Sequence, residues 1–152
     1  MEKEAESFFS KINKFNEIYK IENNTKPTLL NLDRLHNFKK ILLEEVEEIN
    51  EIIEQYQNSL NENSEIPEEK KIEVLTHVSD WLGDIIVYSA SEARRFGVDI
   101  NKILDIIMDS NFSKLDESGN PIHDERGKIL KGPNYWKPEP KIQEFLRREL
   151  ER

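Results

Sequence analysis

The sequence predicts an all-α protein with a four-helix-bundle core, followed by a loop or hairpin segment and a short terminal helix. Glu, Lys and Asn are abundant while only five glycines occur, a composition that favours helices over sheets. Apolar residues also recur at three- and four-residue intervals over long stretches. Because the 152 residues contain no internal repeat, we expect a single domain spanning residues 1–152.

The first two predicted helices are separated by the polar break "ENNTKPT". Residues 1–21 carry an apolar stripe at helical spacing, made of Phe8, Phe9, Ile12, Phe15, Ile18 and Tyr19. The second helix begins near Asn31 or Asp33, both of which are suitable N-caps, and runs to about Gln57. Its stripe of apolar residues is typical of a helix that packs into a bundle.

The third predicted helix runs from about Pro67, which suits a first helical turn, to Arg95, with Gly97 as its stop signal. Asp99 is expected to cap a fourth helix over residues 100–115. Gly, Pro and Asn then recur at short intervals, which predicts an ordered loop or short hairpin. A terminal helix is expected from about Lys141.

The composition excludes several classes of protein. The chain has 31 acidic and 22 basic residues, for a formal charge of -9, which argues against binding a nucleic-acid polymer. It has no cysteine, and therefore neither a disulfide framework nor a thiolate metal site. A charged start and the lack of a long apolar run predict no secretory signal and no membrane association. We therefore expect a cytoplasmic protein.

Carboxylates occur at positions of the second and third helices where apolar residues are expected. Asp80 and Asp84 lie one turn apart inside the apolar stretch "LTHVSDWLGDIIVY". In the second helix, Glu45 falls where the stripe calls for an apolar residue, and Glu44 and Glu48 share its side. Each short motif, taken alone, is also compatible with a solvated helix face. Together, they predict that two neighbouring helices bring acids to one inward face.

Several carboxylates within ~4–6 Å of one another would repel by a few kcal/mol per pair, so the bundle needs compensation. One acid could be protonated, or a Lys or Arg could reach the cluster. The third solution is a hard divalent cation, which takes oxygen ligands. Since no histidine or cysteine lies in obvious register, the cation expected is Mg²⁺ or Mn²⁺ rather than Zn²⁺.

The segments "LLEEVEEI" and "SDWLGDIIVY" resemble the MazG-like all-α nucleoside triphosphate pyrophosphohydrolases, a superfamily shared with phosphoribosyl-ATP pyrophosphohydrolases and dimeric dUTPases. The family pattern is Glu-Glu-x-x-Glu on one helix and Glu-x-x-Asp on the next. Glu44, Glu45 and Glu48 match its first half, and Asp84 matches the final Asp. The resemblance continues into "SNFSKL" and "GKILKGPNY" and covers residues 31–140. One departure is that the family's second-helix Glu falls on Trp81, and we assign its role to Asp80.

The resemblance implies a metal-dependent hydrolase that cleaves an NTP or dNTP between the α and β phosphates, giving the monophosphate and pyrophosphate. Mg²⁺ or Mn²⁺ would be held by the five carboxylates, and one glutamate could take a proton from the attacking water. The implied catalytic residues are Glu44, Glu45, Glu48 and Asp84, with Asp80 added to the metal ligands.

The expected substrate-binding residues are Asn111, Lys114, Lys131 and Tyr135. Asn111 and Lys114 lie three residues apart near a helix end, and Lys114 can pair with phosphate. Lys131 lies in a Gly-rich segment where the backbone can approach a ligand. Each lysine could equally be an ordinary surface charge. The segment Asn134–Trp136 could contact a base or instead pin the tail to the bundle, which we favour.

Two other functions remain open. A nucleotide-sensing or regulatory helical bundle without turnover would account for Trp81, although the retained glutamates and Asp84 argue against it. A structural bundle with a salt-bridged acidic core would need basic residues facing the acids. Because small amphipathic bundles often pair and the family's sites are often completed across subunits, we expect a homodimer or homotetramer. The preferred base and sugar do not follow from the sequence.

Overall fold

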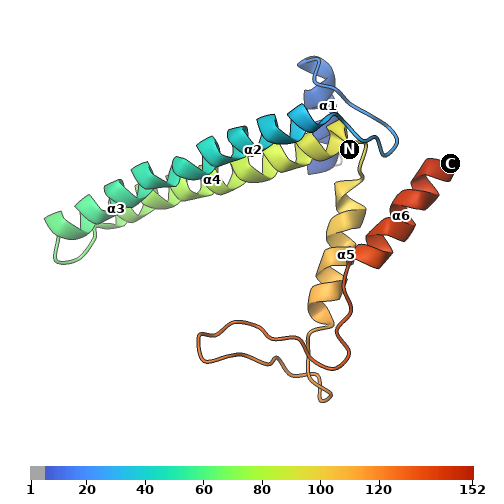
Figure 1. The fold of residues 1–152 in the computed structure, drawn as a ribbon. Coiled ribbons are helices and arrows are strands. Elements are labelled where there is room, and N and C mark those ends of the chain that lie inside the picture. Colours follow the sequence, from blue (N-terminus) through green and yellow to red (C-terminus); the bar gives the residue numbers. More distant parts are fainter. Residues whose placement is uncertain (1–5) are drawn as a thin grey trace, which may run out of the picture. The chain divides into compact units, whose positions relative to one another are not determined.

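The computed structural model describes residues 6–152 and confirms the predicted all-α bundle class (Figure 1). The described part of the chain contains α1 (Phe8–Ile18), α2 (Leu32–Glu47), α3 (Ile49–Glu62), α4 (Glu68–Arg95), α5 (Ile100–Phe112) and α6 (Glu139–Glu151). Between residues 6 and 152 the only β-type pairing is an isolated antiparallel bridge between His123 and Ile129. No helix in this range is both long enough and apolar enough to cross a membrane.

The described residues form two compact units. Unit 1 holds the residues up to Lys20 together with Leu29–Glu92, and therefore contains α1, α2, α3 and nearly all of α4. Unit 2 holds Ile21–Thr28 and Ala93–Arg152, with α5 and α6. The predicted single domain stays a prediction. The acidic motifs lie in unit 1, whereas the expected phosphate-binding residues lie in unit 2.

Unit 1 is built on a helical hairpin, in which α2 and α3 run alongside α4 (Figure 1). Asn31 is the N-cap of α2, and its side chain accepts a hydrogen bond from the Arg34 backbone N–H. The Arg34 guanidinium then bonds both carboxylate oxygens of Glu92 on α4, at 2.7 and 2.6 Å. Because Glu92 is buried and the pair is bidentate, this contact fixes α2 on α4.

The predicted second helix is interrupted, so the expectation of one continuous helix to Gln57 was wrong. α2 ends at Glu47 and α3 begins at Ile49, with Glu48 as the residue between them. The Glu48 N–H donates to the Glu45 carbonyl three residues back, at 3.3 Å, and the Glu51 N–H donates to Glu48 in the same way. These shorter i→i+3 bonds tighten the turn.

The N-terminal helix of unit 1 is held on α4 by a reciprocal polar contact. The Asn16 amide donates to the Ser91 carbonyl, and the Ser91 hydroxyl donates back to the Asn16 side-chain oxygen at 2.8 Å. Asn16 is fully buried, so both of its polar groups need these partners.

The longer segment of unit 2 begins in the last turn of α4. Gly97 has a φ of +66°, and a Cβ there would lie 1.9 Å from the Lys26 carbonyl oxygen, so only glycine fits this predicted stop. Asp99 caps α5 as expected, by accepting from the Lys102 N–H. The loop that follows contains a short hairpin-like pairing, in which the Leu130 N–H donates to the Ile122 carbonyl.

Candidate metal and phosphate sites

Unit 1 contains an acidic cavity of about 270 Å³ between α3 and α4. Its acidic lining residues come from both helices and from the turn at Glu48. Asp80 and Asp84 lie one turn apart on α4, as the sequence predicted, and Trp81 lies between them. The lining residues are Glu48, Glu51, Ile52, Gln55, His77, Asp80, Trp81 and Asp84.

Glu45 is the predicted site residue whose environment departs furthest from water. Its side chain is only 7% exposed, and its Oε1 has no hydrogen-bond partner. Burial raises the pKa of its carboxyl above the ordinary value of 4.5, and the charges of Glu48, Asp84 and Asp80 raise it further. A buried carboxylate without a partner is costly, so this position favours either a proton or a cation.

Trp81, at the family's missing glutamate, contacts the backbone of the first acidic motif. Its indole N–H donates to the Glu45 carbonyl oxygen at 2.8 Å, and the same oxygen accepts the N–H of Glu48. Trp81 therefore ties α4 to the tight turn that carries Glu45 and Glu48. Sequence reasoning treated this residue as a loss to the site, whereas here it holds the turn in place.

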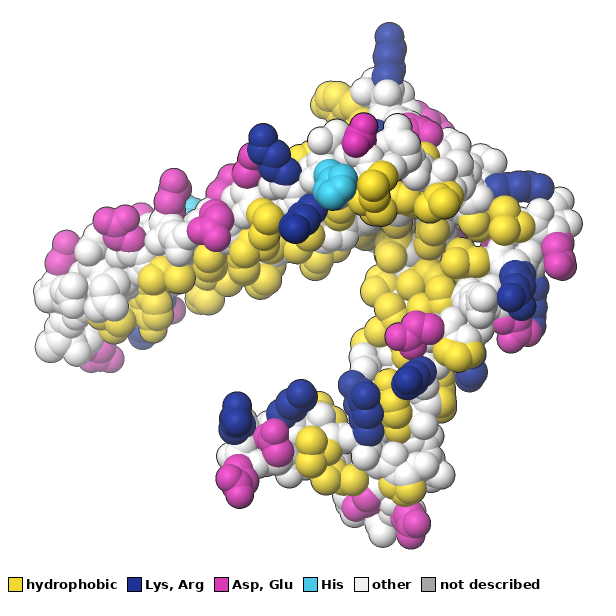
Figure 2. Space-filling view, viewed as in Figure 1, with side chains coloured by type: hydrophobic (Ala, Val, Ile, Leu, Met, Phe, Trp, Pro, Cys, Tyr) yellow, Lys and Arg dark blue, Asp and Glu magenta, His cyan; other side chains and the backbone are white. Residues whose placement is uncertain are grey.

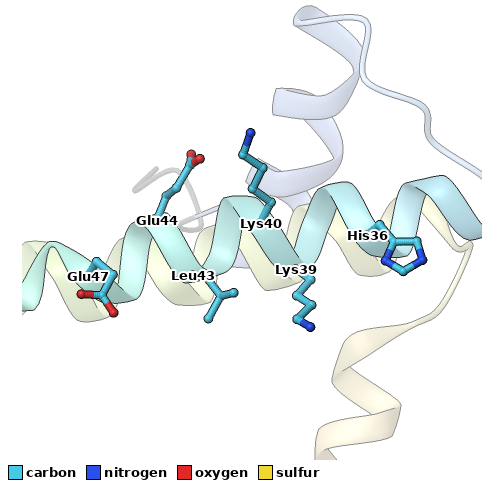
Figure 3. Close-up of a pocket in the computed structure, with 6 residues that line it drawn as sticks. All are labelled: His36, Lys39, Lys40, Leu43, Glu44 and Glu47. Atoms are coloured by element: carbon cyan, nitrogen blue, oxygen red, sulfur yellow. The ribbon is translucent and has the colours of Figure 1, made fainter.

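Glu44 lies apart from the acidic cavity. It is exposed and lines a separate cavity of about 510 Å³ on α2, with His36, Lys39, Lys40, Leu43 and Glu47. Figure 3 shows Glu44 and Lys40 projecting from the same side of α2, with Leu43 and Lys39 on another. The structure therefore brings Glu48, Asp80 and Asp84 to one cavity and Glu44 to another.

Three lining residues of the acidic cavity that carry hydrogen-bond acceptors, Glu51, Gln55 and His77, were not among the predicted site residues. No histidine was expected in register with the acids, whereas the exposed His77 lines the cavity with them. The spacing Glu48, Glu51 and Gln55 at i, i+3 and i+7 is the signal that could have placed them on one face.

The acidic side chains that line this cavity offer carboxylate oxygens, which are the kind of ligand that a hard divalent cation takes. Glu45 is not among the lining residues, but the charges of Glu48, Asp84 and Asp80 reach its carboxyl, and its unpartnered Oε1 is a further candidate ligand. Among residues 6–152, however, no three acidic or histidine side chains stand close enough together to hold a metal ion as they are placed. Water-mediated contacts or side-chain rotation would be needed to complete a coordination sphere.

In unit 2, the segment that carries Lys131 and Tyr135 lies against the chain just after the end of α5, at Lys114. The Gly132 N–H donates to the Lys114 carbonyl at 2.9 Å, which places the segment before Tyr135 against the end of α5. A Cβ at Gly132 would lie 1.9 Å from the Leu115 carbonyl oxygen, so this approach requires glycine. The Lys131 ammonium lies 4.9 Å from the Tyr135 ring centre, and Asn111 is exposed on α5.

The segment Asn134–Trp136 is held on α5 by hydrogen bonds, which is the structural role that the sequence analysis favoured for it. The Ser110 hydroxyl donates to the Trp136 carbonyl at 2.8 Å, and the Trp136 N–H donates to the Ser113 hydroxyl. Lys141 of α6 lies 3.8 Å from the centre of the Trp136 ring. Trp136 therefore has a structural role, and Tyr135 is left as the aromatic beside the exposed lysine.

Comparison with known proteins gives a likeness of fold. No family model matches the chain, and no curated protein matches it in sequence. Among solved structures, it is similar to a "putative NTP pyrophosphohydrolase" from Exiguobacterium sp. 255-15, with a TM-score of 0.51 and 20% sequence identity. The similarity covers 95% of this chain and 97% of the other. The class of protein defined so far is an all-α helical bundle.

Proposed function

We propose that the protein is a metal-dependent nucleoside triphosphate pyrophosphohydrolase of the MazG-like type, which cleaves the α–β phosphate bond of an NTP or dNTP. The observation that carries this proposal is the buried Glu45 carboxyl, whose Oε1 has no hydrogen-bond partner and whose pKa is raised by burial and by the charges of three nearby acids, Glu48, Asp84 and Asp80. The likeness of fold to the Exiguobacterium protein and the acidic motifs support it.

The proposed metal ligands are Glu45, Glu48, Asp80 and Asp84, with Glu44 as the remaining family position. When bound, Mg²⁺ or Mn²⁺ would supply charge neutralisation for a polyphosphate and a water of lowered pKa. Trp81 would hold the turn between α2 and α3, so that Glu45 and Glu48 keep their positions. Glu51, on the wall of the cavity, would add an acceptor for bound water.

The proposed phosphate-binding residues are Lys114 and Lys131, with Asn111 and Tyr135 beside them. Lys114 carries its charge at the end of α5, where the carbonyl of the same residue is already bonded to Gly132. Lys131 would move from the Tyr135 ring to a phosphate oxygen, which forms a stronger, charge-assisted bond.

The deciding experiment is a pyrophosphate-release assay with a panel of NTPs and dNTPs in the presence of Mg²⁺ or Mn²⁺. The proposal predicts monophosphate and pyrophosphate as paired products, and no product after chelation. Release of inorganic phosphate in their place would assign a different bond. Nucleotide binding without any product would favour the non-catalytic sensor, which the Trp81 departure supports.

We also propose that the protein pairs with a second copy through the apolar side of the α2–α3–α4 hairpin. Figure 2 shows a band of hydrophobic side chains along this hairpin. The exposed apolar residues of its helices include Leu43, Val46, Ile53, Tyr56, Leu75 and Leu82. The hairpin alone leaves these apolar side chains exposed to water. A second copy related by two-fold symmetry would bury them against the same surface of its own. Light scattering tests this pairing. We expect the mass of a dimer or tetramer, and Ile53→Asp should shift the equilibrium towards the monomer.

A further inference from the structure

A chain of hydrogen bonds between α3 and α4 ends at His77 on the wall of the acidic cavity. The Lys70 ammonium donates to Glu73 Oε2 at 2.9 Å, and Gln55 Nε2 donates to Glu73 Oε1 at 2.8 Å. Gln55 Oε1 lies 2.7 Å from His77 Nδ1. All four residues belong to unit 1.

The chemistry of the groups fixes the direction of each bond. The hydrogen bond and charge of Lys70 lower the pKa of Glu73, with a smaller contribution from Gln55, so this carboxylate is ionised. An ionised carboxylate only accepts hydrogen bonds, so the amide nitrogen of Gln55 must face Glu73. The amide oxygen of Gln55 consequently faces His77.

The position of the Gln55 oxygen determines the tautomer of His77. An amide oxygen carries no proton, so Nδ1 of the imidazole must donate one. In the neutral ring, Nε2 is then unprotonated and can only accept. Within residues 6–152, no hydrogen bond involves His77 Nε2. A neutral histidine in water favours the opposite tautomer, so Gln55 and Glu73 select this one.

An uncharged hydrogen-bond acceptor is favourable in this acidic cavity. His77 precedes Asp80 by three residues and Asp84 by seven on α4, and all three line the same 270 Å³ cavity. Another carboxylate there would add to the repulsion that already raises the pKa of Glu45. An unprotonated imidazole nitrogen accepts a hydrogen bond from water without adding negative charge.

We infer that His77 Nε2 is a water-binding group of the acidic cavity, accepting a hydrogen bond from a water held by the divalent cation, with Gln55 and Glu73 as the positioning residues that set its tautomer. The inference rests on the proposed function for the identity of the cation. It assigns to His77 a role that the acidic motifs do not imply.

The first test is ¹⁵N–¹H NMR of the histidine rings in the full chain at pH 8 with a chelator present. His77→Gln assigns the His77 signals, and His36→Gln on α2 is the matched control. We expect His77 to carry its proton on Nδ1, and Gln55→Leu to shift it towards Nε2. A wild-type ring protonated on Nε2 would overturn the inference, whether or not the protein has activity.

The second test adds Mg²⁺, with binding followed separately by calorimetry. On saturation, the Nε2 resonance should move in the direction of hydrogen bonding while the Nδ1 proton stays. If calorimetry shows Mg²⁺ binding but the His77 Nε2 resonance does not move, the water-binding role is wrong and the pyrophosphohydrolase proposal still stands. Absence of Mg²⁺ binding would remove the cation from the proposed function and this inference with it.

The kinetic test separates positioning from general damage to the fold. His77→Ala should lower kcat for pyrophosphate release by roughly fivefold to tenfold, the scale of one lost hydrogen bond, with Mg²⁺ affinity within about twofold of wild type. Gln55→Leu should lower kcat less, in step with its tautomer population. A wild-type kcat in His77→Ala would contradict the role. A wild type that releases no pyrophosphate would sink the proposed function, while the NMR tests would still decide the inference.

Discussion

The acids of unit 1 and two lysines of unit 2, Lys131 and Lys141, differ in whether their charged groups already have interaction partners. In unit 1, the buried Glu45 has an oxygen with no partner and three like charges close enough to raise its pKa. In unit 2, Lys131 lies on the Tyr135 ring and Lys141 on the Trp136 ring. Under the proposed function, the unpartnered Glu45 oxygen would gain from a cation before any nucleotide binds, whereas Lys131 would exchange its contact with the Tyr135 ring for a bond to phosphate.

This difference assigns separate tasks to the two units under the proposed function. Unit 1 would bind metal on helices that Arg34–Glu92 and Trp81–Glu45 hold together. Unit 2 would bind phosphate on a segment fixed by glycine and serine contacts. Variants in one unit should consequently leave the other task intact, which is what the following predictions test.

The largest effect is expected from Glu45→Gln and from Asp84→Asn. Each change nearly conserves volume but removes a charge that the cation requires, so hydrolysis should be abolished while the helical circular dichroism remains. The measurement is pyrophosphate release at saturating Mg²⁺. Arg152→Gln, at the exposed end of α6, is the control. Full activity in either site variant would refute the proposed site.

Metal binding should also stabilise unit 1 itself. A cation that binds only the folded chain adds about 2.7 kcal/mol at a hundred times its Kd. EDTA should therefore lower the melting temperature and Mg²⁺ should restore it, as measured by thermal unfolding. Glu45→Gln should show little response to either addition. An equal response in that variant would place the bound cation elsewhere.

Helical spacing explains why so much of unit 1 could be predicted. The 3–4 periodicity alone predicts a core register for Glu45, and the side chain is indeed buried. The bounds of α4 and the Asp99 cap of α5 followed from local signals of the same kind. These features depend only on residues within a few positions of one another.

The features that were missed depend on distant residues. At the break, the Trp81 indole donates to the carbonyl of Glu45, 36 positions away in the sequence, and no residue near Glu48 is a helix breaker. The Arg34–Glu92 pair spans 58 positions, and Gln55 meets Glu73 and His77 across two helices. The relation between the acidic and basic sets likewise involves two units, which periodicity cannot connect.

Lys114→Ala should separate the two tasks. Losing a charged hydrogen bond to phosphate should weaken nucleotide binding or turnover by roughly 1.5–3 kcal/mol and leave Mg²⁺-induced stabilisation almost unchanged. Lys131→Ala should behave likewise but less strongly, because that lysine must first give up its contact with Tyr135 and because Lys128 is only three residues away in the sequence. Glu48→Gln should do the opposite, losing metal affinity first.

Calorimetry with Mn²⁺ alone, and then with a non-hydrolysable nucleotide, measures both steps for each variant. An equal loss of Mn²⁺ affinity in Lys114→Ala and Glu48→Gln would show that the two units do not divide the tasks in this way.

Trp81→Phe tests the contact that replaces the family glutamate. Phenylalanine keeps the ring but removes the N–H, so one hydrogen bond worth about 1 kcal/mol of unfolding free energy is lost. The turn at Glu48 should loosen, and Mg²⁺ affinity should fall with it. Urea unfolding and Mg²⁺ calorimetry give the two values. Trp136→Phe is the matched control, because the hydrogen bonds of that residue are made by its backbone.

The smallest expected effect is a difference in pH dependence between wild type and Glu45→Gln, both measured with chelator. The pKa of Glu45 is higher in the folded chain than its ordinary value of 4.5, so the folded protein keeps this proton longer as the pH rises. The stability that Glu45 contributes is therefore fully present below pH 4.5 and is lost as the pH rises through the folded-state pKa.

Urea unfolding from about pH 4 to 8 should show wild type losing more stability than Glu45→Gln. Saturating Mg²⁺ should narrow this difference in stability, because it favours the ionised carboxylate. Parallel curves without metal would mean that Glu45 reaches water in the folded chain, and the contrast between the unsatisfied acids of unit 1 and the paired lysines of unit 2 would lose its basis.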